Sequence, residues 1–135
     1  MCIINVDFDG VLATNTHEDR LICKVKDEGY SFNDLSPIWD WYDKLVNTVM
    51  LPINTMLMNY LAQLRNEGHS IRLWTNRSYT LRCATERNLG VYTHIFDDML
   101  FYAGQKHFST VEGVVIDNDY KNLSCGQAWF HYSWN

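Results

Sequence analysis

Short apolar runs and helical repeats alternate along most of the chain. The first run, residues 2–6, is apolar and rich in β-branched side chains, as is typical of a buried strand. Similar runs predict further strands at residues 71–74, 95–96 and 114–116, and an edge strand at 128–132. Each run is too short for a helix, so the pattern indicates a sheet of short strands.

Helical spacing appears between these runs. The clearest repeat covers residues 53–64, and Gly68 is placed to end that helix. Another helix is expected after Ser78, a good N-cap, and it should stop at Gly90. Strands that alternate with helices predict an α/β fold, a doubly wound parallel sheet in a single domain.

Residues 13–50 follow the first strand and form an insertion too small to be a separate domain. Its first part, residues 13–19, is polar and reads as a loop, and residues 21–29 fit a short hairpin. A helix should open at Ser36-Pro37 with one apolar face. That face either packs on the domain or grips a substrate. We therefore expect one domain, residues 1–135, with a small flap or cap at 13–50.

Composition narrows the function classes. A length of 135 residues and a hydrophobic content of 47% suit one globular domain. The net charge of −5 disfavours broad binding to a nucleic-acid backbone, although a local basic pocket would still permit it. Four scattered cysteines predict reduced thiols, and neither a signal peptide nor a membrane-spanning run is apparent. We expect a soluble, cytoplasmic protein.

Polar residues gather where three of the predicted strands end. Asp7 and Asp9 follow the first strand, and in an extended chain both carboxylates point the same way. Like charges this close are costly unless a cation or a proton separates them. Asp9 could instead only cap its own turn. Because parallel strands place their sites at one edge, we expect these groups to converge with those that end the second and fourth strands, namely Thr75, Asn76, Asp117, Asn118 and Asp119.

Such a set of oxygen ligands suits Mg²⁺, and none of the five histidines shows ligand spacing. The candidate metal ligands are Asp7, Asp9, Asp117, Asn118 and Asp119. Mg²⁺ with carboxylates favours chemistry on a phosphate, in which one aspartate attacks the phosphorus and a second carries protons. Asp9 is placed for the second task.

The chain resembles the haloacid dehalogenase (HAD) superfamily. The segments D-F-D-G-V at 7–11, L-W-T-N-R at 73–77, Lys106 and V-I-D-N-D at 115–119 are similar to its four motifs and occur in the same order. The resemblance implies that Asp7 is the nucleophile and a metal ligand, and that Asp9 is the acid/base and binds the metal through its backbone carbonyl. It also implies that Thr75 binds the phosphoryl group. By the same resemblance Lys106 steadies nucleophile and phosphate, and Asp117 holds Mg²⁺.

The pattern is most similar to small HAD phosphohydrolases of bacteria and phages, in which a lysine precedes the last acidic motif by about ten residues. Lys106 lies eleven residues before Asp117. Asn76 and Arg77 are candidate substrate-binding residues, although an arginine at a helix start can also be simply exposed. One departure is Asn118, where the family usually has a second acid. Either Asn118 or Asp119 could complete the metal shell.

We therefore expect a Mg²⁺-dependent phosphatase that acts on a small phosphorylated substrate such as a nucleotide or sugar phosphate. A small cap leaves such a site open or lets it borrow a lid from a partner subunit, so an oligomer is possible. One alternative is a phosphatase for nucleic-acid 3′ ends or phosphoproteins. Another is a HAD-fold binding protein without turnover, for which Asn118 is the single favourable feature.

Overall fold

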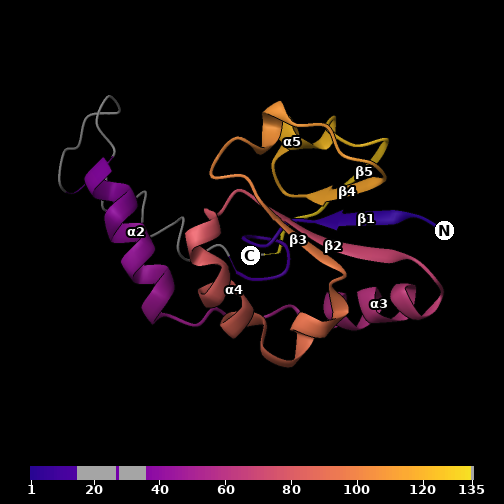
Figure 1. Ribbon diagram of the computed structural model, residues 1–135, viewed down its shortest axis with the longest axis horizontal. Coiled ribbons are helices and arrows are strands. Elements are labelled where there is room, and N and C mark those ends of the chain that lie inside the picture. Colours follow the sequence, from indigo (N-terminus) through magenta and orange to yellow (C-terminus); the bar gives the residue numbers. More distant parts are fainter. Residues whose placement is uncertain (15–26, 28–35, 135) are drawn as a thin grey trace.

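A central parallel sheet organises the computed structural model, which describes residues 1–14, 27 and 36–134 (Figure 1). Its order is β3-β2-β1-β4-β5. All four strand pairs are parallel, as the alternation of strands and helices predicts. The strands are β1 (Ile3–Val6), β2 (Ser70–Thr75), β3 (Asp98–Phe101), β4 (Val114–Asp117) and β5 (Ala128–His131).

The first strand lies at the centre of the sheet. Ile4 is in register with Ile71 of β2 on one side and with Val114 of β4 on the other. Val6, its last residue, is fully buried. A strand with neighbours on both edges and cover on both faces favours apolar residues, which explains the apolar run at the N-terminus. The exception is Asn5, which is fully buried and donates its amide to the carbonyls of Glu112 and Val114.

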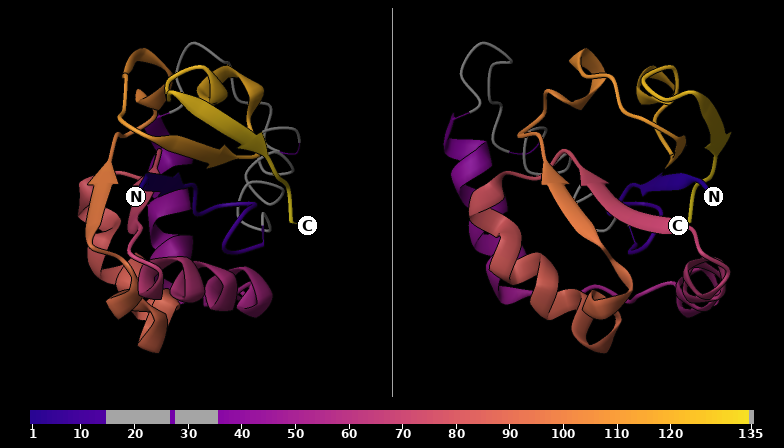
Figure 2. Two further views of the ribbon diagram at one scale, coloured as in Figure 1. Left: turned by 90° about the vertical axis from the view of Figure 1, so that its right-hand side faces the viewer. Right: turned by 45° about the vertical axis from the view of Figure 1, so that its right-hand side comes forward.

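Helices cover both faces of the sheet (Figures 1 and 2). Helix α3 (Thr55–Asn66) contacts β2, and α4 (Arg82–Leu89) follows a 3₁₀ turn at Tyr79–Leu81. The short α5 (Tyr120–Leu123) packs on β4 and β5. Helix α2 (Ser36–Thr48) lies outside the sheet, beside the turn that opens α4 (Figure 1). The predicted helices at 36, 53–64 and 78–90 are present.

Successive residues of the strands pack into two hydrophobic cores, one on each face of the sheet. Leu73 belongs to the larger one, where residues of β1 and β2 pack with Met58 and Leu61 of α3. Trp74, the next residue, points to the opposite face and packs with Val115 and Leu123. The period of two in a strand thus divides the apolar residues between the α3 side and the α5 side.

The strand predicted at residues 95–96 is misplaced. Residues Gly90–Ile95 form a 3₁₀ helix, and Ile95 is buried at its end. The strand begins three residues later, at Asp98. Between them Asp97 bonds to Ile71 of β2 through both its backbone N–H and its carboxylate. The apolar pair at 95–96 therefore marks the turn before the strand, with Ile95 buried and Phe96 partly buried.

The ends of the predicted insertion meet at the sheet. Ala13 forms an isolated antiparallel bridge with Ile53, and the Asn54 N–H donates to the carbonyl of Leu12. The hairpin predicted at residues 21–29 lies outside the described residues, apart from residue 27. In the described part of the chain, no helix is both long and apolar enough to span a bilayer.

Candidate active site

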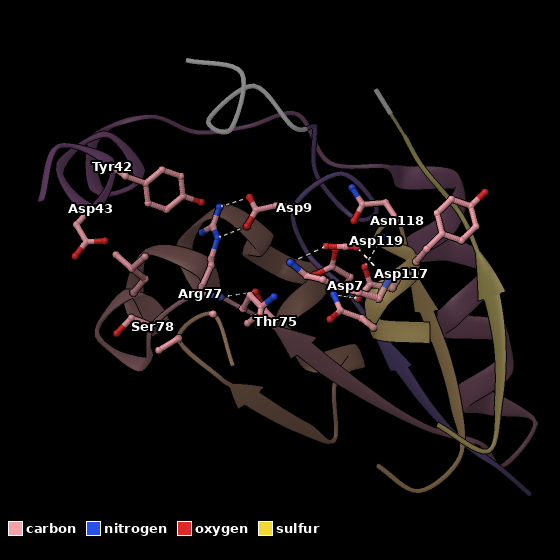
Figure 3. A pocket seen from close by; sticks show the side chains of 17 residues that line it. Asp7, Asp9, Tyr42, Asp43, Thr75, Arg77, Ser78, Asp117, Asn118 and Asp119 are labelled. Carbon is pink, nitrogen blue, oxygen red and sulfur yellow. Dashed lines mark hydrogen bonds and ion pairs between the residues drawn. The ribbon is translucent and has the colours of Figure 1, made fainter. Parts of the chain in front are cut away.

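A pocket of about 820 Å³ lies at the carboxyl edge of the sheet. The last residue of β2 (Thr75), the last of β4 (Asp117) and the first after β1 (Asp7) all line it (Figure 3). All three are buried. The pocket is also lined by Asp9, Tyr42, Asp43, Asn76, Arg77, Ser78, Leu81, Ala103, Gly104, Asn118, Asp119, Tyr120, Lys121 and Asn122.

A tight turn after β1 presents the two first aspartates. The Asp7 N–H continues the ladder to β4 by donating to the carbonyl of Ile116 at 2.9 Å. The Phe8 carbonyl then accepts bonds from the N–H groups of residues 11, 12 and 13. Gly10 adopts φ +83°, a conformation that residues with a Cβ rarely take. The turn holds Asp7 and Asp9 at the pocket, as predicted from their spacing.

Lys106 lies between two carboxylates. Its Nζ is 3.0 Å from Asp7 Oδ1 and 2.5 Å from Asp117 Oδ2, and its side chain is fully buried. The ammonium also lies 4.2 Å from the ring centroid of Trp74, close enough for a cation–π contact. Lys106 thus joins Asp7, which precedes it by 99 positions, to Asp117, which follows it by 11 positions.

Burial and charge shift the protonation of this cluster. Burial, together with the charges of Asp117 and Asp9, raises the pKa of Asp7 to about 7 although Lys106 opposes the shift. Burial alone would lower the pKa of Lys106, but the carboxylates of Asp7 and Asp117 outweigh it and raise that pKa. The cluster thus holds two carboxyl groups and one ammonium, so its ionised form has an excess negative charge.

Asn76 fixes the loop that carries Lys106. Its Oδ1 accepts the backbone N–H of Lys106 at 3.0 Å, and its carbonyl accepts the N–H of Gly104 at 2.9 Å. Ala103, just before Gly104, has φ +48°, the left-handed region that is strained for alanine. Asn76 therefore lines the pocket but uses its side-chain oxygen to position Lys106.

Arg77 is turned inward onto Asp9. Its Nε and Nη2 donate to the two oxygens of Asp9, each at 2.9 Å, and only 2% of its side chain is exposed (Figure 3). Its Nη1 donates to Thr85 Oγ1 at 3.0 Å. The sequence leaves Arg77 as a candidate for substrate contact or for an exposed helix start, whereas the structure places it in a buried ion pair.

Asp119 and Asn118 both line the pocket, and the carboxylate of Asp119 is engaged with its own loop. The Asp119 carboxylate accepts the N–H of Lys121 and lies 3.5 Å from its ammonium, which makes it the N-cap of α5. The carbonyl of Asn118 is 3.1 Å from His131 Nε2. The ring of His131 in turn stacks on Tyr120. These contacts fix the loop after β4.

The donors beside Lys106 fit a hard cation. Asp7 and Asp117 supply carboxylate oxygens with excess negative charge, and the buried Oδ1 of Asn122 has no hydrogen-bond partner among the described residues. Oxygen donors of this kind suit Mg²⁺. However, no cluster of three His, Cys, Asp or Glu side chains that could hold a metal occurs in the part of the chain that the structure describes. The carboxylate of Asp119, a predicted ligand, is engaged with Lys121. The carboxylate of Asp9 is engaged with Arg77, which does not involve its backbone carbonyl, the atom through which the resemblance implies that Asp9 binds the metal.

Sequence reasoning missed two residues of this site. Asn122 donates its amide to Asp117 Oδ2 at 3.3 Å, and Thr85 supports Arg77. Tyr42 lines the pocket from α2, the helix whose apolar face the sequence offers for packing or for gripping a substrate. Thr85 appears in the sequence only as a member of a helix face. Asn122 stands five residues after Asp117, and this spacing is the one available signal.

Comparison with known proteins identifies the fold. No protein-family model and no curated protein matches the chain. Among solved structures it is similar to a haloacid dehalogenase-like hydrolase from Streptococcus pneumoniae (TM-score 0.62, 13% identity, 93% of this chain and 79% of that one).

Two further solved structures are similar to the chain in fold. One is described as a predicted phosphoglycolate phosphatase from Haemophilus somnus (TM-score 0.58, 11% identity, 95% of this chain and 83% of that one). The other is a HAD-superfamily hydrolase of subfamily IA from Geobacter sulfurreducens (TM-score 0.53, 15% identity, 93% of this chain and 84% of that one). The chain has the fold of the HAD superfamily, as its motifs indicate.

Proposed function

We propose that the protein is a Mg²⁺-dependent phosphomonoester hydrolase that works through an aspartyl-phosphate on Asp7. The observation that carries the proposal is the buried cluster of Asp7, Lys106 and Asp117. It opens into a pocket at the edge where the parallel strands end. Packing alone does not favour two buried carboxylates around one lysine, whereas phosphoryl transfer needs such a site.

The first step joins Asp7 to the substrate. A carboxylate oxygen of Asp7 attacks phosphorus, an O–P bond forms, and the bond from phosphorus to the leaving oxygen breaks. That oxygen takes a proton from Asp9, which lies at the same pocket. In the second step water attacks phosphorus, the Asp7–phosphorus bond breaks, and the water proton passes to Asp9. Inorganic phosphate and an alcohol are the products.

Lys106 and Thr75 support both steps. The Lys106 ammonium contacts Asp7 and offsets negative charge as phosphate approaches. The Thr75 hydroxyl accepts the N–H of Arg77, which leaves its own hydrogen available for a phosphoryl oxygen. Asp7 and Asp117 would hold Mg²⁺ together with the amide oxygen of Asn122. When bound, the ion supplies positive charge that neutralises phosphate and nucleophile together.

A small phosphorylated metabolite, such as a nucleotide or sugar phosphate, fits the site best. The pocket volume of about 820 Å³ lies within the usual range for small-molecule sites, roughly 300–1,000 Å³. Tyr42 and Asp43 of α2 form part of its wall, so the insertion contributes to the enclosure. The net charge of −5 offers little attraction for a nucleic-acid backbone. Small substrates are therefore proposed ahead of nucleic-acid ends or phosphoproteins.

Phosphate release from a substrate panel tests the proposal. The panel contains nucleotides, sugar phosphates, a 3′-phosphorylated oligonucleotide, a phosphopeptide and an aryl phosphate, each assayed with Mg²⁺ and with EDTA. We expect release that requires Mg²⁺ and disappears in Asp7→Asn. A folded wild-type protein that releases no phosphate from any substrate would favour a binding protein instead. Release that EDTA does not reduce would exclude the metal role.

A further inference from the structure

A chain of buried contacts leads from Asp9 away from the reacting atoms. Both Asp9 oxygens accept from Arg77, whose Nη1 donates to Thr85 Oγ1. The Thr85 hydroxyl donates in turn to the carbonyl of Leu81 at 2.8 Å. The contacts join the turn after β1 to the segment that opens α4, and Arg77 lies 68 positions after Asp9 in the sequence.

Arg77 has little freedom to leave this position. The guanidinium lies 4.3 Å from the ring centroid of Phe8, which is itself fully buried. Three N–H groups are engaged with Asp9 and Thr85 in the fork geometry that only arginine provides. The pair is also favourable electrostatically, since Asp9 offsets the effect of burial and raises the pKa of Arg77.

We propose that Arg77 is a positioning residue that aims Asp9 at the reacting phosphoryl group, with Thr85 fixing Arg77. The inference rests on the proposed phosphatase function. It assigns Arg77 to the orientation of Asp9 in place of direct phosphate binding. Ordinary packing gives no reason to bury an arginine and point its fork at a carboxylate that still has 22% of its side chain exposed at the pocket.

The geometry leaves Asp9 able to react. A carboxylate has about four lone-pair sites, and Arg77 occupies one on each oxygen. Among the described residues no other side chain donates to the Asp9 carboxylate, so its remaining sites can accept a proton. In the hydrolysis of the aspartyl-phosphate, water forms a bond to phosphorus, the bond to Asp7 breaks, and the water proton passes to Asp9. A wrongly rotated Asp9 would slow this step, while phosphate would still bind.

Four variants separate positioning from binding: Arg77→Gln, Arg77→Lys, Thr85→Val and Asp9→Asn. Arg82→Gln is the matched control, because Arg82 lies nearby in α4 and contacts Glu86 and Tyr79 at the surface. Each variant is assayed on an aryl phosphate, whose leaving oxygen needs little help from an acid. Acid quenching then measures the fraction of enzyme carrying phosphate on Asp7, and inorganic phosphate is used as an inhibitor.

We expect kcat to fall about tenfold to a hundredfold in Arg77→Gln, somewhat less in Thr85→Val, and not in Arg82→Gln. The phosphorylated fraction should rise in Arg77→Gln, as we also expect for Asp9→Asn, and inhibition by phosphate should stay unchanged. Arg77→Lys should not restore kcat, since lysine lacks the planar guanidinium that donates to both oxygens of Asp9. Adding Arg77→Gln to Asp9→Asn should not lower kcat further, because both substitutions act through the carboxyl group of Asp9.

Other results would overturn the inference. Weaker inhibition by phosphate with kcat retained would make Arg77 a phosphate ligand. Wild-type kinetics in both Arg77→Gln and Thr85→Val would show that Asp9 needs no support. If Arg77→Gln does not fold, the kinetics of Thr85→Val decide between positioning and binding, because that variant preserves shape and removes only the hydroxyl that accepts from Arg77 and donates to Leu81. A wild-type enzyme no more active than Asp7→Asn would instead refute the phosphatase function, and the inference with it.

Discussion

At the scale of residues, the site has more buried carboxylates than ammonium groups to neutralise them. Asp7 and Asp117 share one ammonium, that of Lys106, and all three side chains are buried or nearly so. Burying an unmatched charge is costly, and a cation bound beside these carboxylates would relieve the cost. The stability of the protein should therefore depend on both pH and metal.

The pH dependence follows from the pKa of Asp7, which is raised from 3.8 to about 7. In this range the folded state binds more protons than the unfolded state, so the free energy of unfolding falls as pH rises. Without metal, we expect Tm to decrease between pH 4 and pH 7. The decrease should be smaller in Asp7→Asn, which cannot ionise. Thermal melts in EDTA check this, and an identical decrease in both proteins would contradict it.

Removing the lysine should expose the repulsion between the two carboxylates. Breaking a buried charge pair typically costs about 3–5 kcal/mol, and we expect a loss of this order in Lys106→Met without metal. Added Mg²⁺ should restore part of it. Urea unfolding with and without Mg²⁺ measures both effects. Lys121→Met is the control, since that pair is exposed and should change stability by less than about 1 kcal/mol.

Residue spacing accounts for much of the site but not for its pairings. Asp7, Thr75 and Asp117 could be predicted because each lies at the end of a parallel strand, and such ends meet at one edge. The ion pair of Arg77 with Asp9 could not, because it depends on how the segment after β2 turns. The same holds for Asn122, whose placement follows from the short α5.

At the scale of elements, one side chain ties α3 to the sheet. Asp97 accepts bonds from the Ile71 N–H of β2 and from Arg65 of α3. We expect Asp97→Ala to lower the free energy of unfolding by about 1–2 kcal/mol, since it leaves a backbone group unpaired. Asp97→Asn keeps an acceptor and should cost less. Equal stability of all three proteins in urea unfolding would show that the tie contributes nothing.

Helix α2 contributes one wall of the pocket. Tyr42 lines it, and Figure 3 shows its ring on the side of Arg77 and Asp9. We expect Tyr42→Ala to raise KM for a small substrate about tenfold, a loss of about 1.4 kcal/mol, because apolar contact is removed. Tyr42→Phe should retain most of the affinity. The exposed Lys44→Ala is the control, and an unchanged KM in Tyr42→Ala would place substrates away from α2.

Elements were predictable where periodicity was unbroken. The central strand and the helix at 53–64 follow from apolar spacing alone. The third strand does not, because Ile95 and Phe96 belong to a 3₁₀ turn and the strand that follows begins with an exposed aspartate. Short edge strands carry little apolar signal, so tertiary pairing with β2 decides their position.

At the scale of the whole molecule, the doubly wound sheet gathers segments that are remote in sequence. The strand order places β1 between β2 and β4, so the motifs that follow these three strands meet at one edge. The small insertion closes back on the domain through Ala13 and Ile53. The sheet thereby brings Asp7, Asp9 and Thr75 to one pocket, with Lys106 buried beside Asp7.

The central claim is that Asp7 becomes phosphorylated during turnover. The most direct measurement is an acid quench of enzyme, Mg²⁺ and substrate within one turnover, followed by mass spectrometry of the peptides. We predict one added phosphoryl group, on the peptide containing Asp7, that is absent with EDTA and absent in Asp7→Asn. Turnover with no phosphorylated peptide, or a phosphoryl group on any other residue, would contradict the account.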